Sequence, residues 1–310
     1  MRISAIFVLS LFLLHCGFDM SPWIEKPKPK KIPHRFSEYM PSLEPSKMKF
    51  IIVKPKLAKS MDIRDSKFRG KPFLPKGVAF PRNKLGEKMV LLVQINFEQV
   101  PDLEPFPQSG ILQIFVTSNV NQEHVWGKNN YYSGDPWVPL EYFEHLQKQD
   151  YFKVQYFSAE ACQQESQPIG DEELLDDILP IMSPMKLEFE IGEEYCGVED
   201  YRFWDYLRVS PEEFFAKHGN EEWDDLDNFF RFLASEDLAK LGGYGRFTCG
   251  DPRTELKARN EWMVLLNIES GPVGREEILW GDNGVGTFFI REPDLKNLNF
   301  SAVAYYWDNH

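Results

Sequence analysis

The chain has 310 residues, of which 43% are hydrophobic, so it is long enough for about two ordinary domains or one large one and can fill a core. Its 35 basic and 48 acidic residues leave a formal net charge of −13 at pH 7, which repels phosphate backbones and argues against a nucleic-acid function. Disorder throughout the chain is excluded by the same composition.

Residues 1–16 have the plan of an export signal, with a basic residue near the start, an apolar run over 3–14 and then Cys16. The run is shorter than the roughly 20 residues that a membrane span needs. The stretch LLHC resembles the lipobox of bacterial lipoproteins, but His15 stands where a small residue is usual. We predict a lipid anchor at Cys16 and a place in the cell envelope. The alternatives are an ordinary buried N-terminal segment or a start at Met20, either of them giving a cytoplasmic protein.

Residues 17–45 are expected to form an extended linker. They contain six prolines and five basic residues with few apolar residues between them. Proline-rich chain is extended and stiff, which suits a tether between a lipid anchor and a folded body over 46–310. We interpret the linker as solvated, and contact of its basic residues with anionic lipid is the alternative.

The body carries similar landmarks twice, in the same order. Lys67 matches Lys240 and Gln94 matches Asn267, both at an offset of 173 residues (240 − 67 and 267 − 94). Because several landmarks stay in register, we predict the duplication of a β-rich unit. In each copy a Gly/Pro loop leads to two apolar strands, expected over 89–96, 110–116, 262–269 and 284–290.

The pattern of the body predicts an α+β fold of two internally duplicated β-rich halves, about 60–160 and 235–310, with mixed or antiparallel sheets. Helices are expected mainly between the repeats. Ser210 begins a capping box that is followed by proline, which predicts a helix ending at Gly219. Further helices are expected over 140–149, 171–179 and 220–233, and further strands over 152–156, 187–191 and 300–306.

Five motifs together resemble the YwqG-like family, a bacterial domain family without an established function, over about residues 46–310: KFRGKPFLPKG, LLVQINF, KLGGYGRFTCGDPR, LWGDNGVGTFFI and YYWD. The resemblance implies one compact α+β body built by duplication, commonly cytosolic, with no agreed catalytic residue. Some relatives resemble toxin-immunity proteins, which implies a protein-binding role. The chain departs from the family pattern at Arg69, Gly245, Cys249 and Asn267. Any chemistry that the family carries at those positions is altered here.

The glycine-rich stretch at 240–253 is a candidate anion site. Glycines such as Gly243 let backbone N–H groups approach an anion, and Arg253 could pair with it. The stretch matches neither GxxxxGK[ST] nor GxGxxG. The plainer interpretation is a helix C-cap at Gly242 or Gly243 followed by an Asp-Pro turn, with Arg253 bonding backbone carbonyls.

A second candidate is WGDNGVG, which contains Trp280, Asp282 and Asn283. It resembles a calcium loop but lacks the distal glutamate of an EF-hand, so a tight hairpin turn is the favoured interpretation. No metal site is predicted, since the histidines are scattered and the cysteines lack zinc-ligand spacing. Each of the three cysteines after Cys16 is expected to be a packed side chain, and Cys249 is the one for which a lowered pKa is expected, because it lies in a glycine-rich loop between Arg246 and Arg253. Three unpaired thiols also favour a reducing compartment.

Two classes of function remain open at this stage. The first is a non-catalytic binding protein of unknown ligand, with a toxin-immunity protein as a variant. The second is a hydrolase or transferase in which Asp251 or Asp282 is the general base, Arg253 binds an anionic group and Trp280 forms a wall. We favour the first because no nucleophile, base and orienting group are recognisable together. The sequence points to no cofactor.

Overall fold

The computed structural model describes residues 29, 31–118, 122–128, 140–170, 179–219, 223–254 and 256–309. The chain divides into a sheet unit, Lys49–Gly192 and Asp237–His310, and a helical unit, Met1–Met48 and Glu193–Glu236. The expected signal with Cys16, and all but the last residue of the helix expected over 171–179, lie outside the described residues. Within the described part of the chain, no helix reaches the length and apolarity that crossing a membrane requires.

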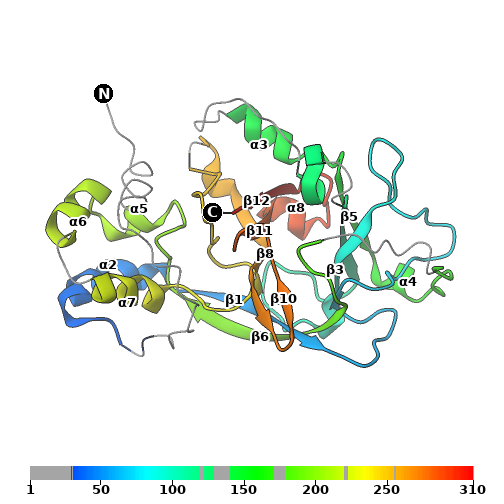
Figure 1. Ribbon diagram of the computed structural model, residues 1–310, viewed down its shortest axis with the longest axis horizontal. Coiled ribbons are helices and arrows are strands. Elements are labelled where there is room, and N and C mark those ends of the chain that lie inside the picture. Colours follow the sequence, from blue (N-terminus) through cyan, green and yellow to red (C-terminus); the bar gives the residue numbers. More distant parts are fainter. Residues whose placement is uncertain are drawn as a thin grey trace. The chain divides into compact units, whose positions relative to one another are not determined.

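One ten-stranded sheet dominates the sheet unit (Figure 1). The strand order is β12-β11-β8-β7-β1-β6-β2-β3-β4-β5, and a separate ribbon pairs β9 with β10. The strands are β1 (Met48–Leu57), β2 (Lys67–Phe68), β3 (Val90–Asn96), β4 (Ile111–Val116), β5 (Phe152–Phe157), β6 (Met185–Glu194), β7 (Ala239–Leu241), β8 (Trp262–Glu269), β9 (Gly271–Val273), β10 (Glu276–Ile278), β11 (Val285–Arg291) and β12 (Ala304–Asp308). The expected strands of both copies are therefore confirmed to within a few residues.

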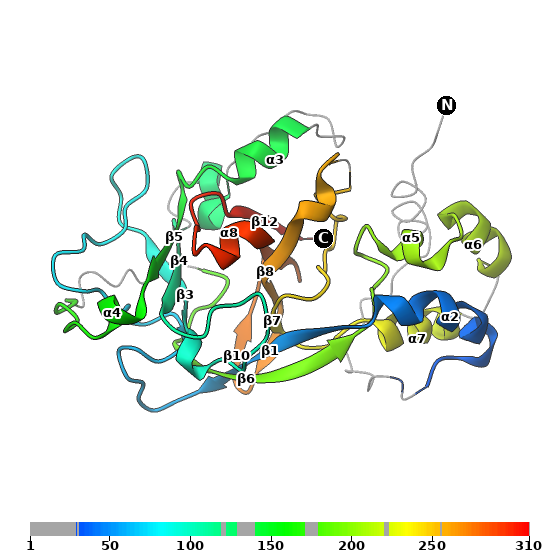
Figure 2. The ribbon, with the colours of Figure 1, turned by 180° about the vertical axis from the view of Figure 1, so that it is seen from behind.

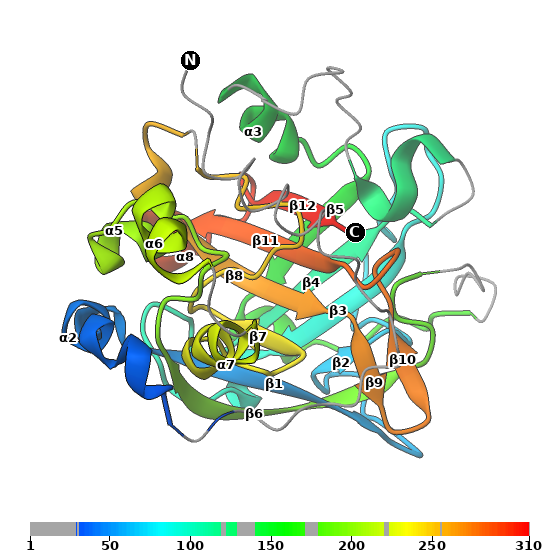
Figure 3. The same cartoon turned by 60° about the vertical axis from the view of Figure 1, so that its left-hand side comes forward.

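The sheet curls strongly, so that β3, β4 and β5 lie behind β8 and β11 (Figure 3). Side chains join its two ends: the ring of Phe152 in β5 lies 5.3 Å from that of Tyr305 in β12 and 6.3 Å from that of Phe288 in β11. The inner face thus packs against itself and forms the main core. Every residue of β3 is buried, which requires the outer face to be covered as well.

Loops, not helices, cover much of the outer face. Phe73 and Leu74 from the loop after β2 pack on Ile111, and Phe247 and Leu256 from the loop after β7 form part of a second outer cluster. The helical segments of this unit are short: η3 (Phe97–Gln99), η4 (Gln122–Gly127), α3 (Leu140–Leu146), α4 (Ala159–Cys162), η6 (Arg259–Glu261) and α8 (Glu292–Lys296).

The expected α+β class is therefore wrong, since the molecule is mainly β with a single curled antiparallel sheet. The physical reason is that a curled sheet buries its own inner face, and apolar side chains on irregular loops bury the outer one. Such loops leave no periodic signal, so the sequence pattern did not show that they cover the sheet. The two long strands β1 and β6 join what we expected to be separate halves, and lysines of β1 pair with glutamates of β6 along them, as Lys54 does with Glu190.

The sheet has two four-stranded flanks around the central β1 and β6. The first flank is β2-β3-β4-β5 outward from β6, and the second flank is β7-β8-β11-β12 outward from β1. Lys67 pairs with Gln94 in the first, and Lys240 pairs with Asn267 in the second, so the sequence landmarks occupy matching positions. Common descent of the flanks stays a prediction.

The helical unit groups α2, α5, α6 and α7, with α2 beside α7 (Figures 1 and 2). Aromatic side chains fill it, and the rings of Phe36 and Phe229 stack at 4.7 Å. The capping box at Ser210 is confirmed. Residues 34–46, expected in an extended linker, instead form helical turns because Phe36, Tyr39 and Leu43 are buried. The segments are η1 (His34–Tyr39), α2 (Met40–Leu43), η2 (Glu44–Ser46), α5 (Phe203–Leu207), α6 (Pro211–His218) and α7 (Trp223–Leu233).

Candidate functional site

The two charged candidates in the glycine-rich stretch bind each other. The Arg253 guanidinium donates from Nε and Nη2 to the two carboxylate oxygens of Asp251, at 2.9 and 2.7 Å, and from Nη1 to the carbonyl of Trp262 at 3.0 Å. Arg253 is fully buried, and its guanidinium lies 4.9 Å from the ring centre of Phe289. A buried bidentate pair of this kind fixes the loop on the sheet and leaves neither group open to a ligand.

The beginning of the same stretch is a strand and not the end of a helix. Lys240 and Leu241 belong to β7, and the chain turns at Gly242 and Gly243, with φ values of +75° and +74°. The positive φ values explain the glycines, since other residues are strained there. The expected helix C-cap is therefore wrong. The expected hydrogen bond from Arg253 to a backbone carbonyl is present, and the acceptor is Trp262.

Trp280 lies in the inner core, on the other face of the sheet from Arg253. It is fully buried between Trp126 and Trp307, with ring centres 5.9 and 6.2 Å away. The Trp280 ring packs directly on the backbone of Gly286, and this position requires glycine because a Cβ there would lie 2.4 Å from the ring. Its indole Nε1 has no hydrogen-bond partner among the described residues. Trp280 therefore forms part of the core and does not line an outer-face site.

Asp282 and Asn283 are exposed in a turn after Trp280. The turn is not the expected hairpin turn, because β10 pairs with β9 while β11 pairs with β8 and β12. Asn283 has a φ of +55°, a conformation that asparagine tolerates better than most residues. The turn closes with the Gly284 N–H donating to the Trp280 carbonyl at 2.7 Å. The predicted site residues thus divide into a buried ion pair, a core tryptophan and an exposed turn, and the structure does not bring Asp251, Arg253 and Asp282 together.

Three of the motifs that carry the family resemblance meet at a residue that was not predicted, Asp308. Its Oδ2 accepts the backbone N–H groups of Thr248 at 3.1 Å and Cys249 at 2.8 Å. The WGDNGVG turn lies beside it, because a Cβ on Gly284 would be 1.8 Å from the Asp308 carbonyl oxygen. The sequence did offer a signal for this residue. Asp308 is the acidic residue of the otherwise apolar motif YYWD, and an acidic residue at the end of a buried strand needs hydrogen-bond partners.

Burial raises the pKa of the Asp308 carboxyl, and the two backbone N–H groups oppose this only in part. Its Oδ1 has no hydrogen-bond partner within the described chain. Burial also lowers the pKa of the nearby Lys128 ammonium, which lies 4.8 Å from the ring centre of Trp307. The geometry is that of a structural acid beside a lysine, with one carboxylate oxygen bonded to the backbone, and neither of the hollows described below includes Asp308 among its lining residues.

The expectation for Cys249 is wrong. Loss of solvation and the Asp308 carboxylate raise the pKa of its thiol, which donates to the Asn309 carbonyl at 3.2 Å. The neighbouring arginines do not act on it because Arg253 pairs with Asp251 and Arg246 pairs with Glu269 at 3.1 Å. A thiol with a raised pKa is a poor nucleophile at neutral pH.

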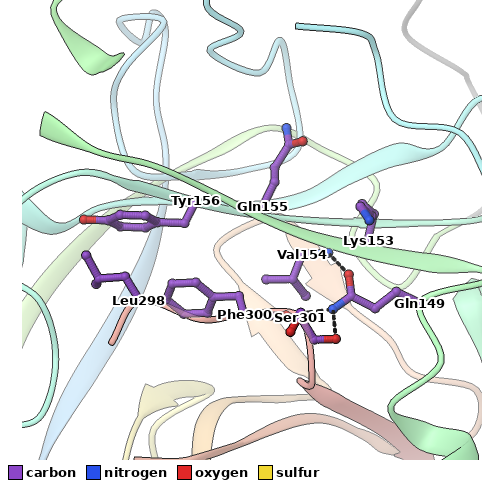
Figure 4. A pocket seen from close by; sticks show the side chains of 8 residues that line it. All are labelled: Gln149, Lys153, Val154, Gln155, Tyr156, Leu298, Phe300 and Ser301. Atoms are coloured by element: carbon purple, nitrogen blue, oxygen red, sulfur yellow. Dashed lines mark hydrogen bonds between the residues drawn. The ribbon is translucent and has the colours of Figure 1, made fainter. Parts of the chain in front are cut away.

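A concave surface lies at the edge of the sheet along β5. One hollow, of about 290 Å³, is lined by β5 and by the segment before β12, where Tyr156 stacks on Phe300 at 5.4 Å (Figure 4). Gln149 spans it, accepting the Val154 N–H at 2.9 Å and donating to the Phe300 carbonyl at 2.8 Å. Figure 4 shows Gln155 and Lys153 directed away from Phe300.

A second hollow, of about 440 Å³, adjoins the first and shares Gln149, Lys153 and Gln155 with it. Residues 79–84 of the loop before β3 form its other wall, which contributes Arg82 and Lys84. Asp150 pairs with Lys84 at 3.1 Å, whereas Lys153 is exposed and has no anionic partner in the described chain. The hollows are shallow and basic, and sequence reasoning did not single out any of these residues.

A family model described as a domain of unknown function, DUF1963, matches residues 66–309, and the chain therefore belongs to this family. The matched range includes every strand from β2 to β12 and the Asp308 region. No curated protein matches the chain.

Proposed function

For this member of the DUF1963 family, we propose a non-catalytic function: binding of another protein through the surface of the sheet unit. The proposal rests on one observation: the charged residues that could do chemistry are buried and paired with each other, whereas the surface along β5 is accessible. Asp251 and Arg253 satisfy each other inside the loop, whereas the hollows along β5 are open and are lined by charged, amide and aromatic side chains. A catalytic site needs reactive groups that converge on a cavity, and a binding surface does not.

The reactive side chains support the same proposal. A general base must reach a substrate proton, and Asp251 lies in a buried ion pair while Asp282 is in an exposed turn. The Cys249 thiol has a raised pKa, which opposes nucleophilic chemistry. These positions make a hydrolase or transferase at the second flank the weaker proposal.

Three further proposals come with this one. We propose that the chain is a YwqG-like member of the family, that its two flanks arose by duplication, and that Cys16 carries a lipid which tethers the binding protein to a membrane. The matching positions of Lys67 and Lys240 support the duplication. The apolar run before Cys16 supports the tether.

The binding function is tested by site-specific photo-crosslinking in the native host. A photoreactive amino acid replaces, one at a time, exposed residues spread over the sheet unit: Lys153, Leu57, Leu85, Met182 and Leu279. We expect at least one position to give a discrete adduct with a single protein, which excess untagged chain competes away. The proposal fails if no position gives such an adduct and the purified chain turns over a metabolite.

The tether is tested by replacing Cys16 with serine. Lipidation needs the cysteine, so the variant should leave the membrane fraction and appear in the soluble fraction, with mass spectrometry showing no lipid on the N-terminus. The matched control is Cys162→Ser, which should stay with the membrane. Recovery of the unaltered chain from the soluble fraction would contradict the tether while leaving the binding function standing.

A further inference from the structure

The outer edge of β5 is free of strand partners in the described chain. β5 ends the sheet on the side of the first flank and pairs only with β4. The Val154 N–H points away from β4, because it donates to the Gln149 side chain at 2.9 Å. Alternate residues of a strand direct their backbone groups to the same side, so Phe152 and Tyr156 also present theirs outward. An unpaired edge of this kind accepts an added strand.

Positive charge lies beside this edge in a chain that is strongly acidic as a whole. The charged residues that line the second hollow are Arg82, Lys84, Lys153 and one acid, Asp150, although the net charge of the chain is −13. Arg82 and Lys153 line the same hollow, and Asp150 neutralises only Lys84. The local surplus of positive charge attracts an acidic partner and repels a basic one.

The side chains along β5 separate into two rows that specify what an added strand would carry. Lys153 and Gln155 face the basic hollow, and Gln155 continues a row of hydrogen-bonded amides by donating to Gln113 at 2.6 Å. Val154 and Tyr156 lie with Phe300 along the other hollow. Residues directly opposite each other in paired strands have side chains on the same face.

We propose that the β5 edge binds an extended, acidic segment of a partner protein, which adds to the sheet as an eleventh strand. This rests on the proposed binding function and names its site and partner. The segment alternates acidic or amide side chains, which meet Lys153 and Gln155, with apolar side chains, which meet Val154 and Phe300. On binding, the segment displaces Gln149 from the Val154 N–H and takes over that hydrogen bond.

Pairing of two copies of this chain through β5 is the competing arrangement. It would bring together two edges that each carry Lys153 and two chains that each carry a net charge of −13. Like charges facing each other across strands are destabilising. An acidic segment of another protein avoids both repulsions, so we commit to it.

The test uses the full chain and labelled seven-residue peptides that alternate glutamate and valine. Binding is measured by fluorescence anisotropy at 50 and 300 mM salt, against peptides in which lysine replaces glutamate or proline replaces the central residue. We expect the acidic peptide to bind, with affinity falling at the higher salt. The lysine and proline peptides should bind at least tenfold more weakly.

Two variants and a matched control locate the binding. Lys153→Glu should weaken binding of the acidic peptide at least tenfold, whereas Lys49→Glu, the same change on an exposed position of β1, should alter it less than twofold. Val154→Pro removes the outward N–H and should also weaken binding at least tenfold. Proline is tolerated at an edge strand when the missing N–H faces away from the sheet, so β4 pairing is kept. Urea unfolding curves confirm that each variant is folded.

Several results would overturn the proposal. Equal binding by Lys153→Glu and Lys49→Glu would show that general charge attraction is responsible, and equal binding of the proline peptide would exclude strand addition. Sedimentation of the unaltered chain as a dimer that Val154→Pro dissociates would establish the competing arrangement. A crosslinked partner found only at Leu57, Leu85, Met182 or Leu279 would uphold the binding function and refute the β5 site.

Discussion

In both flanks of the sheet a loop rich in glycine and proline covers the outer face, but different side chains bond the loop to the strands. In the first flank, Gln94 accepts the Phe73 N–H at 2.9 Å and Gln113 donates to the Phe73 carbonyl at 2.7 Å. The two amides also bond each other at 2.7 Å. The loop after β2 is therefore bound by neutral groups, whose hydrogen bonds do not depend on pH or salt.

In the second flank, the matching positions hold Asn267 and Thr287, which are shorter. Asn267 donates to Thr287 at 2.6 Å and reaches the Arg246 carbonyl only at 3.4 Å. The buried pair of Arg253 and Asp251 takes over the bonding of the loop after β7. The comparison teaches that one loop position can be fixed by amides or by ions, and that removing one member of an ion pair should be the more damaging change.

The largest effect is expected from Arg253→Met. The variant leaves the Asp251 carboxylate buried without its partner, and breaking a buried pair in this way typically costs about 3–5 kcal/mol. Urea unfolding at pH 7 measures the loss. Lys296→Met, which breaks the exposed pair with Glu292, serves as the control and should leave the urea midpoint almost unchanged, because solvent screens exposed pairs. If Arg253→Met loses no more than this control, the ion pair does not fix the loop.

The next effect is a pH dependence that belongs to the first flank. Burial lowers the pKa of the Lys67 ammonium to about 8, although its Nζ donates to the Ile63 carbonyl at 2.8 Å. Between about pH 8 and 10.5 the unfolded chain binds a proton that the folded chain has released, so stability should rise with pH in this window by up to about 3 kcal/mol.

Urea unfolding at pH 7.5, 8.5 and 9.5 measures this rise as the difference between the natural chain and Lys67→Met. The variant lacks the titrating group, so its curve should be flatter. Parallel curves for the two proteins would show that Lys67 keeps its ordinary pKa in the fold. Lys240→Met, the change at the matching position of the second flank, controls for the loss of a buried lysine as such.

A smaller effect separates the matching positions Gln113 and Thr287. Gln113→Leu removes bonds to Phe73, Gln94 and Gln155, and should cost about 2 kcal/mol because buried partners are left unsatisfied. Thr287→Val removes one acceptor and should cost about 1 kcal/mol. The Gln113→Leu loss should be the same at 0.05 and 1 M NaCl. Equal losses for both variants would contradict the view that amides carry the first loop.

The sequence predicted the individual strands and helix ends that leave a local pattern in the chain. The strands over 89–96 and 262–269 are present as β3 and β8, and the capping box at Ser210 begins α6. Apolar runs and capping residues are local signals, and local signals survive in the fold. The predicted fold class was wrong because irregular loops, through side chains such as Phe73 and Phe247, cover the outer face of a single curled sheet.

The candidate site was predicted less well, for a different physical reason. Asp251 and Arg253 stand two residues apart, and that spacing could have suggested that they pair with each other before any ligand. The β5 edge could not be found, since which strand ends a sheet depends on the order of all strands. The contacts of Asp308 could not be predicted either, because they depend on the strand register that places it opposite Val285, next to the WGDNGVG turn.

The smallest change in stability is expected from a substitution of Asp308, the last residue of β12 in the second flank. Burial raises the pKa of this carboxyl, so folding favours its neutral form. The resulting stabilisation is present below the ordinary pKa range of aspartate and is lost as the pH rises through the folded value. Asp308→Asn keeps an acceptor oxygen for the N–H groups of Thr248 and Cys249 and removes the charge. We expect unfolding curves at pH 7 within about 1 kcal/mol of the natural chain and a weaker pH dependence between pH 4 and 7. A large loss at pH 7 would instead mean that the ionised carboxylate, like Asp251, is needed to fix the loop.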